Sequence, residues 1–231
     1  MLGVPWAVDG VDTRRLVTHL RDRGVMRGGI STELDPEVLL EHVQAHPVLD
    51  GQDLVSTAGG GRRSVGTDGP RIAAIDCGIK ESIASRMTGA GCRLEIFPPG
   101  ATVEEILAVD PAALFCSNGP GAPAAAGHVV AAIEGVLGKI PVFGICMGHQ
   151  LLARALGLET ERLPFGHRGA NHPVRRAEDD RVEITVQNHG YAVSGDRLPD
   201  GVEITRTSLF DGSVEGIRAP ELRAWAAENG V

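Results

Sequence analysis

Residues 141–153 have the sequence PVFGICMGHQLLA, an apolar strand pattern followed by a tight turn and the start of a helix. Cys146 stands between Gly144 and Gly148, which is the spacing of a strand–turn–helix elbow that presents a nucleophile. Glycine at both positions relieves the crowding of so sharp a turn. Free N–H groups and the dipole at a helix start favour a thiolate. We therefore predict that Cys146 is a nucleophile, with a buried cysteine in a packing turn as the alternative.

Around this elbow, short apolar runs alternate with helix-like segments. We expect strands at 71–78, 92–98, 112–119 and 141–146, and helices at 80–90, 102–109, 129–137 and 148–156. This alternation predicts an α/β fold in which a mainly parallel sheet is flanked by helices. Residues 181–188 and 201–207 alternate apolar and polar side chains, which is typical of half-exposed antiparallel strands.

The N-terminal third has a different pattern. We expect one helix over 14–23, with Asp12 at its start and Gly24 at its end, and a second over 36–43. Residues 56–70, STAGGGRRSVGTDGP, are rich in Gly, Ser and Thr and predict a linker. The expected division is therefore a small N-terminal part at 1–55, the linker at 56–70 and the main domain at 71–231.

Composition narrows the classes of function. The 231 residues are 42% apolar and 23% charged, which favours a packed core over disorder. A formal net charge of -8 disfavours nucleic-acid binding, which needs clustered cations. No leader and no apolar run of ~18 residues is visible, so we expect no membrane span and a cytoplasmic location. The four cysteines form no CxxC pair, and we expect Cys77, Cys92 and Cys116 to be core residues.

A glycine-containing loop supports the site at the elbow. Residues 117–123, SNGPGAP, follow the third expected strand. Gly119 and Gly121 allow backbone N–H groups to approach a ligand or a developing oxyanion. The loop and Cys146 both follow strands, and the carboxyl ends of strands are where ligands bind in open α/β sheets.

Five stretches, taken together, resemble one family. They are SNGPGAP (117–123), PVFGICMGHQLLA (141–153), FGHRGANHPV (165–174), QNHGYAV (187–193) and SLFDGSVEGI (208–217). Their order and sequence resemble the small chain of carbamoyl-phosphate synthase, a class I glutamine amidotransferase. The segment VDGVDTRRLVTHLRDRGVMRGGIS (8–31) is similar to the end of that family's N-terminal domain. The resemblance implies the class I glutamine amidotransferase fold, preceded by a partial N-terminal small domain.

The resemblance also implies roles. Cys146 attacks the side-chain amide of glutamine and carries a glutamyl thioester, while the N–H groups of Gly121 and Met147 form the oxyanion hole. The residues that hold the substrate are Gly119, Gly121, Met147, Gln150, Asn188, Gly190 and Tyr191. The released ammonia passes to a large synthetase chain, which makes carbamoyl phosphate for arginine and pyrimidine synthesis. That partner uses ATP and Mg²⁺, because this chain has no P-loop and is expected to hold no cofactor.

Two departures from the family pattern matter. Ala122 replaces an aspartate of the glycine loop, and no His-Pro-Glu motif follows His189. That motif supplies the general base and its orienting carboxylate in the family. We therefore expect a chain truncated at both ends, with crippled glutaminase activity and with Trp225 exposed. The alternative is an inactive module that binds glutamine or a partner.

Other histidines are candidate substitutes for the base. His149 follows the nucleophile on the elbow helix, and we expect a packing role for it. His189 lies in the QNHG segment beside the glutamine pocket and is a weak stand-in for the base. The spacing of His167 and His172 suggests a metal pair, but no further ligand cluster accompanies them. We therefore expect a structural loop there and no metal.

Overall fold

The computed structural model describes residues 7–227, with side chains up to residue 224. The chain divides into two compact units between residues 47 and 48. The first unit contains α1 (Thr13–Arg23) and α2 (Pro36–Ala45). Asp12 caps α1 by accepting a hydrogen bond of 2.9 Å from the backbone N–H of Arg15, and Gly24 ends it with a φ of 83°. Both helices predicted in this segment are confirmed.

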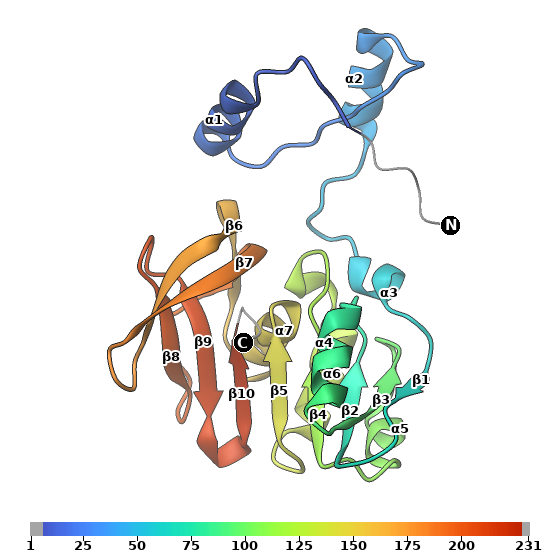
Figure 1. Ribbon diagram of the computed structural model, residues 1–231, viewed down its shortest axis with the longest axis vertical. Helices are drawn as coiled ribbons and strands as arrows, with labels where there is room; N and C mark the ends of the chain where they lie inside the picture. Colours follow the sequence, from blue (N-terminus) through green and yellow to red (C-terminus); the bar gives the residue numbers. More distant parts are fainter. Residues whose placement is uncertain (1–6, 228–231) are drawn as a thin grey trace. The chain divides into compact units, whose positions relative to one another are not determined.

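The second unit is built on one mixed sheet (Figure 1). Within the described residues the strand order is β1-β3-β2-β4-β5-β10-β9-β7-β6-β8. The strands are β1 (Arg63–Val65), β2 (Arg71–Ile75), β3 (Arg93–Phe97), β4 (Ala113–Cys116), β5 (Val142–Ile145), β6 (Thr160–Arg176), β7 (Val182–Val193), β8 (Glu203–Ser208), β9 (Val214–Ala219) and β10 (Ala224–Ala227). β3, β2, β4, β5 and β10 are mutually parallel, whereas β6 to β9 pair antiparallel. The predicted mainly parallel α/β sheet is confirmed, with an antiparallel extension.

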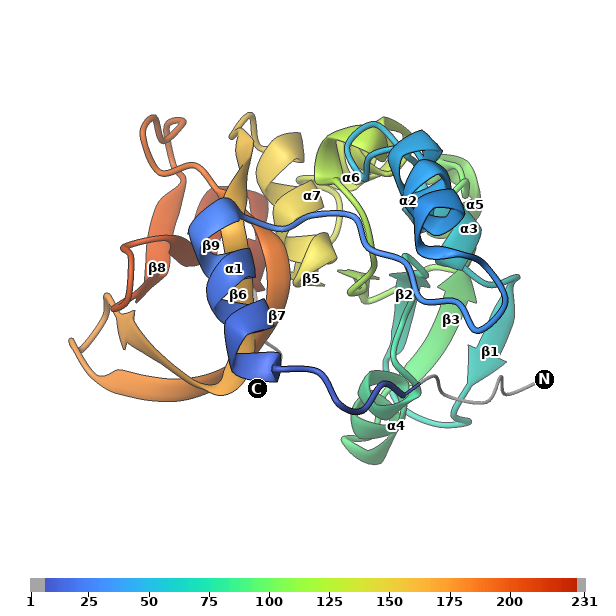
Figure 2. The same cartoon turned by 90° about the horizontal axis from the view of Figure 1, so that it is seen from above.

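Helices cover both faces of the parallel half (Figure 2). They are α4 (Glu81–Gly89), α5 (Val103–Leu107), α6 (Gly127–Val136) and α7 (Met147–Ala155). On one face, Ala84 of α4 packs with Leu94 and Phe115. On the other face, the larger core joins Ile106, Ile133 and Leu151 of α5, α6 and α7 to the sheet. Because alternate residues of each strand point to opposite faces and both faces are covered, the central strands β4 and β5 contain no charged residue, whereas β3 nearer the edge carries Arg93 and Glu95.

The segment expected to be a linker differs from that prediction. It begins within α3 (Leu54–Ala58), which Asp53 caps through the N–H of Ser56 at 3.0 Å. It also contains β1, which pairs antiparallel with β3 at the edge of the sheet. The glycine-rich composition therefore surrounds a short edge strand, whose three residues are too few to leave a period-two pattern.

β7 is antiparallel as predicted, but its burial pattern is unusual. Val182, Ile184 and Val186 are 52%, 68% and 70% exposed. The intervening Thr185 and Gln187 are buried. The apolar face of this strand is therefore turned to solvent and the polar face is turned inward, which implies that the polar side chains have partners inside the protein.

The last described strand completes the sheet between its two halves. β10 pairs parallel with β5 and antiparallel with β9. The side chain of Trp225 lies outside the described residues, so its expected exposure stays a prediction. Among the helices in the described part, none has both the length and the apolar character needed to cross a membrane.

Candidate active site

Cys146 occupies a strained backbone position at the predicted elbow. It lies between β5 and α7 with φ 54° and ψ -110°, a region that side-chain-bearing residues rarely adopt. A Cβ added at Gly144 would lie 2.4 Å from the carbonyl carbon of Gly148. One added at Gly148 would lie 2.0 Å from the carbonyl oxygen of Cys116. The glycines on either side of Cys146 are therefore needed for close backbone packing, as the sequence predicted.

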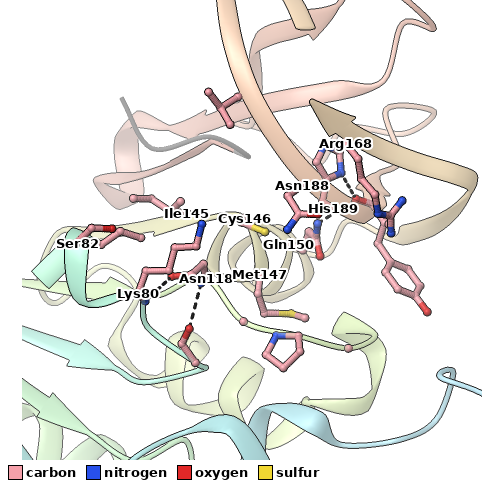
Figure 3. Close-up of a pocket in the computed structure, with 18 of the residues that line it drawn as sticks. Lys80, Ser82, Asn118, Ile145, Cys146, Met147, Gln150, Arg168, Asn188 and His189 are labelled. Carbon is pink, nitrogen blue, oxygen red and sulfur yellow. Dashed lines mark hydrogen bonds between the residues drawn. The ribbon is translucent and has the colours of Figure 1, made fainter. Parts of the chain in front are cut away.

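Cys146 opens into a cavity of about 700 Å³ at the carboxyl ends of the strands (Figure 3). All the predicted substrate-holding and oxyanion residues line it, namely Gly119, Gly121, Met147, Gln150, Asn188, Gly190 and Tyr191. In Figure 3 the sulfur lies with Asn188 and Gln150 on one side and Lys80 and Asn118 on the other. The structure thus brings together residues from four segments of the chain around one thiol.

The glycine loop is held tightly beside Cys146. A Cβ at Gly119 would lie 2.1 Å from the carbonyl oxygen of Cys77, and Gly121 has a φ of 98°. Asn118 fastens the loop to the turn after β2, because its Nδ2 donates to the Gly78 carbonyl at 3.0 Å. Such a loop keeps its backbone N–H groups fixed in space, which is what stabilisation of a developing oxyanion requires.

The opposite wall of the cavity is joined to the elbow helix by hydrogen bonds. Gln150 Nε2, one turn after Cys146, donates to the Tyr191 carbonyl at 2.9 Å. His189 Nδ1 lies 2.8 Å from the same carbonyl oxygen. The Tyr191 hydroxyl donates to Asp50, a residue that also pairs with Arg162 at 2.9 Å. Gln150, His189 and Tyr191 therefore form one connected wall.

Electrostatically, the cavity differs from the chain as a whole. Lys80, Arg86 and Arg168 are among its lining residues, and none of the lining residues in the described chain is a carboxylate. The complete sequence nevertheless carries a formal net charge of -8. A cavity with such a wall favours an anionic ligand or an anionic intermediate.

The other cysteines behave as the sequence predicted in two of three cases. Cys77 and Cys116 are fully buried. Burial raises the pKa of Cys77 to about 12 and raises that of Cys116 well above its ordinary value. Cys92 is half-buried and packs at the edge of the smaller core. Cys146 is also half-buried, but it faces the cavity.

One cluster was not foreseen. His167, His189 and Glu215 are buried and offer ligand-type atoms that all lie within 4.8 Å of one another. The expectation that no ligand cluster accompanies His167 is therefore wrong. The partner beside His167 is not only His172, whose ring centroid lies 5.1 Å away, but also a carboxylate 48 residues further along the chain. The sequence signal that could have indicated this cluster was Glu215, an acidic residue between apolar residues in the SVEGI part of the 208–217 stretch.

His149 is fully buried on α7, in agreement with the expected packing role. The remaining lining residues that the sequence did not single out include Leu49, Ser82, Ile83, Arg86, Met87 and Arg168. They come from α4 and the segment before α3, which no motif marks, and from β6, where Arg168 lies within the FGHRGANHPV stretch without having been assigned a role.

The elbow, the glycine loop and the parallel sheet together define a glutamine amidotransferase of class I. The pattern of the family described as "Glutamine amidotransferase class-I" matches residues 73–227, and the chain belongs to this family. A solved glutamine amidotransferase from Thermotoga maritima has the same fold, with a TM-score of 0.53 at 19% identity over 70% of this chain and 75% of that one.

Curated relatives are more similar in sequence. The chain is 44% identical to the carbamoyl phosphate synthase small chain of Symbiobacterium thermophilum over 223 residues, covering 93% of this chain and 61% of the relative. It is 42% identical to the small chain of Akkermansia muciniphila over 222 residues, covering 91% of this chain and 60% of the relative. The chain therefore spans about three fifths of the length of the relatives it matches.

Proposed function

We propose that this chain is the glutamine-hydrolysing part of a carbamoyl phosphate synthase small chain. The observation that carries the proposal is the thiol of Cys146 at a strained elbow, in one cavity with the Gly119–Gly121 loop. The identity of 44% to a small chain of that name supports the particular synthase.

The proposed reaction uses the cavity as follows. The thiolate of Cys146 attacks the carboxamide carbon of glutamine, forming a C–S bond and an oxyanion. Met147 is the first residue of α7, so its N–H has no partner within the helix, and together with the N–H of Gly121 it is available to that oxyanion. Collapse of the intermediate breaks the C–N bond, and the nitrogen gains one proton, equivalent to the one that the thiol lost, and leaves as ammonia. Water then hydrolyses the thioester to glutamate and restores the thiol.

The proposal also includes a destination for the released ammonia. We propose that it passes to a large synthetase chain that uses ATP and Mg²⁺ with bicarbonate, and that the present chain supplies only nitrogen. The sequence supports this division of work because it contains no Gly-rich phosphate loop followed by Lys and Ser or Thr.

Glutamate release from glutamine tests the proposal. The purified chain is assayed alone and with a large synthetase chain, beside Cys146→Ser. Release that depends on Cys146 and rises with the large chain supports the proposed function. Slow release that stays above the Cys146→Ser rate supports the prediction of crippled activity. A rate equal to that of Cys146→Ser in both conditions refutes the enzyme, and calorimetric binding of glutamine by that chain then identifies the inactive binding module.

A further inference from the structure

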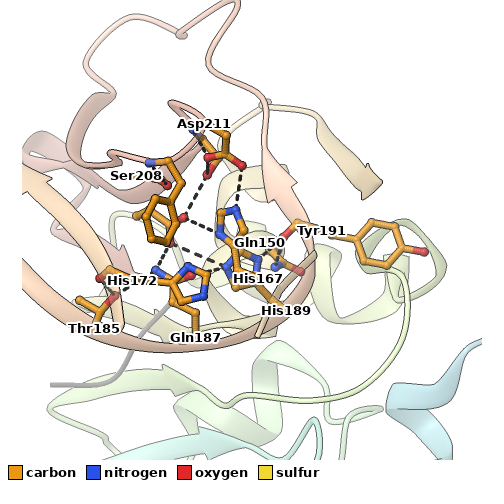
Figure 4. Close-up of polar contacts among 12 residues, drawn as sticks. Gln150, His167, His172, Thr185, Gln187, His189, Tyr191, Ser208 and Asp211 are labelled. Atoms are coloured by element: carbon orange, nitrogen blue, oxygen red, sulfur yellow. Dashed lines mark hydrogen bonds and ion pairs between the residues drawn. The ribbon is translucent and has the colours of Figure 1, made fainter. Parts of the chain in front are cut away.

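Behind the cavity wall, a chain of buried polar side chains runs from β9 through β7 to α7 (Figure 4). Glu215 on β9 has no exposed surface, and its Oε2 accepts a hydrogen bond of 2.8 Å from Gln187 Nε2. Gln187 Oε1 accepts from His189 Nε2, and His189 Nδ1 reaches the Tyr191 carbonyl. That carbonyl also accepts from Gln150 of the elbow helix. Glu215 is thus linked to the elbow without lining the cavity.

Within this series of buried side chains, the Thr185 hydroxyl and the Glu215 carboxylate determine which way the Gln187 amide points. The Thr185 hydroxyl donates to the His172 carbonyl at 3.0 Å, so its oxygen accepts from Gln187 Nε2 at 3.1 Å. Rotating the Gln187 amide by a half-turn would place its oxygen against the Glu215 carboxylate. Gln187 therefore presents Oε1 to His189, and a carbonyl faces the other ring nitrogen. Both groups that face the His189 ring nitrogens in this arrangement, Gln187 Oε1 and the Tyr191 carbonyl, are hydrogen-bond acceptors.

Carboxylates and imidazole rings lie close together in this cluster. Glu215 Oε2 lies 3.8 Å from His189 Nε2, and its Oε1 lies 3.2 Å from His167 Nδ1. The second ring nitrogen of His167 lies 2.7 Å from Asp211. Two imidazole rings and two carboxylates thus alternate behind the wall, and Glu215 is the group that lies beside both rings. Removing its charge would leave the buried His167 with Asp211 as its remaining carboxylate partner.

We propose that Glu215 is the positioning residue for the substrate wall: acting through Gln187 and His189, it fixes the Tyr191 carbonyl against Gln150. The inference rests on the proposed function, because the wall is the part of the cavity that would hold glutamine. In this arrangement both ring nitrogens of His189 are engaged by the wall, at Gln187 Oε1 and at the Tyr191 carbonyl.

A metal ion is the competing occupant of the same cluster. His167, His189 and Glu215 lie close enough to share one. However, Gln187 Oε1 occupies the position that a metal would take at His189 Nε2, and His167 has a carboxylate beside each ring nitrogen. The carboxylates beside His167 and the Gln187 contact of His189 account for the cluster without a metal ion.

The test compares two ways of modifying Cys146. A glutamine-shaped diazoketone, 6-diazo-5-oxo-norleucine, must bind in the cavity against the wall before it reacts with Cys146. Iodoacetamide can react with Cys146 without such binding. Glu215→Gln removes the charge and keeps the size. Glu203→Gln is the matched control, because Glu203 lies on β8, is half-exposed and pairs only with Arg218 at 2.7 Å among the described residues.

For Glu215→Gln we expect the half-saturating diazoketone concentration to rise about tenfold or more, since a buried hydrogen bond to a charged group is lost. The rate of reaction with iodoacetamide should stay within about twofold of the wild-type rate. Glu203→Gln should react with both reagents as the wild type does. For Glu215→Asp, which keeps the charge, the half-saturating diazoketone concentration should lie between those of the wild type and Glu215→Gln. This variant replaces Glu215→Gln in the test if the latter does not fold.

Each remaining outcome has a definite meaning. The positioning role is overturned if the half-saturating diazoketone concentration of Glu215→Gln equals that of the wild type. It is also overturned if Cys146 of Glu215→Asp loses reactivity equally toward both reagents. A change in the wild-type half-saturation on adding EDTA or ZnCl₂ overturns it in favour of a metal centre. A wild-type rate that never saturates with the diazoketone instead refutes the proposed glutamine site, and this result is separate from any effect of Glu215.

Discussion

Replacing Gly148 by alanine tests the elbow most directly, because helix propensity and packing predict opposite results. Gly148 lies in the first turn of α7, where alanine is intrinsically better than glycine by ~1 kcal/mol. Its added Cβ, however, would lie 2.0 Å from the carbonyl oxygen of Cys116 and 2.5 Å from the carbonyl carbon. Non-bonded heavy atoms pack at about 3.5 Å, so α7 and the end of β4 must separate by roughly 1 Å or more.

The expected cost follows from that separation. Overpacking in a well-packed interior costs about 1–3 kcal/mol, and a clash with backbone at a strained turn belongs at the upper end of this range. After subtracting the ~1 kcal/mol that alanine gains in a helix, Gly148→Ala should lower the free energy of unfolding by about 2 kcal/mol or more. The displaced elbow should also slow alkylation of Cys146 in the folded protein.

The matched control is the same substitution at Gly89, the last residue of α4. A Cβ there would meet no atom within 4 Å, and the backbone has no positive φ. Gly89→Ala should therefore keep or raise the free energy of unfolding, by up to about 1 kcal/mol. Urea unfolding of the two variants and the wild type measures both effects. If Gly148→Ala were as stable as Gly89→Ala and alkylated at the wild-type rate, the close packing of α7 on β4 would not be what shapes the elbow.

Three further predictions follow from the same structure. Mass-spectrometric mapping after brief iodoacetamide treatment at pH 7.5 should find Cys146 modified and Cys77 and Cys116 unmodified, because burial raises the pKa of the latter two thiols; labelling of either one would contradict their burial. The Glu215 carboxylate, opposed by burial and assisted by a second carboxylate, raises the pKa of His167 from 6.5 to about 9. A raised folded-state pKa contributes stability that is full below pH 6.5 and is lost as pH rises through about 9. Between pH 6 and 10 the free energy of unfolding of the wild type should therefore fall by about 2–3 kcal/mol more than that of His167→Gln. Parallel curves of unfolding free energy against pH for the two proteins would refute this prediction. Thr102→Ala removes the capping box at the start of α5 and should cost about 1 kcal/mol in urea unfolding; no loss would show that the cap is not needed there.

The parallel half of the fold was predictable because its signals are local. Each buried strand is a short, mostly apolar run, and each is followed by a helix-like segment; the start of α5 is also marked by its capping box. The elbow was predictable for the same reason, since Gly144, Cys146 and Gly148 lie within five residues and one steric requirement explains all three. The oxyanion and substrate residues came from the resemblance to a family, and the structure shows that they line one cavity.

The antiparallel half was less predictable because its partners are distant in sequence. β6 has 17 residues with Pro164 and Pro173 inside it, and its pairing with β7 shifts register twice. Such irregularities erase the period-two pattern on which strand prediction depends. The buried cluster was hidden for a related reason. Glu215 and Gln187 come from different strands, and only the completed sheet places them in contact.

The carboxylates near the cavity explain how an acidic chain builds a cationic pocket. Asp76 lies just after β2, where its charge would face the site, but Arg63 pairs with it at 2.9 Å and the N–H groups of Gly78 and Ile79 donate to it. Although burial opposes ionisation, these contacts lower the pKa of Asp76 below its ordinary value. Asp50 is likewise engaged by Arg162. Both carboxylates are thus bound by the scaffold and neither lines the cavity, so the charged side chains that line it are cationic. That field favours the two negative charges that the proposed glutamine hydrolysis requires there, a substrate carboxylate and a thiolate, and it does so through the fold and not through any single residue.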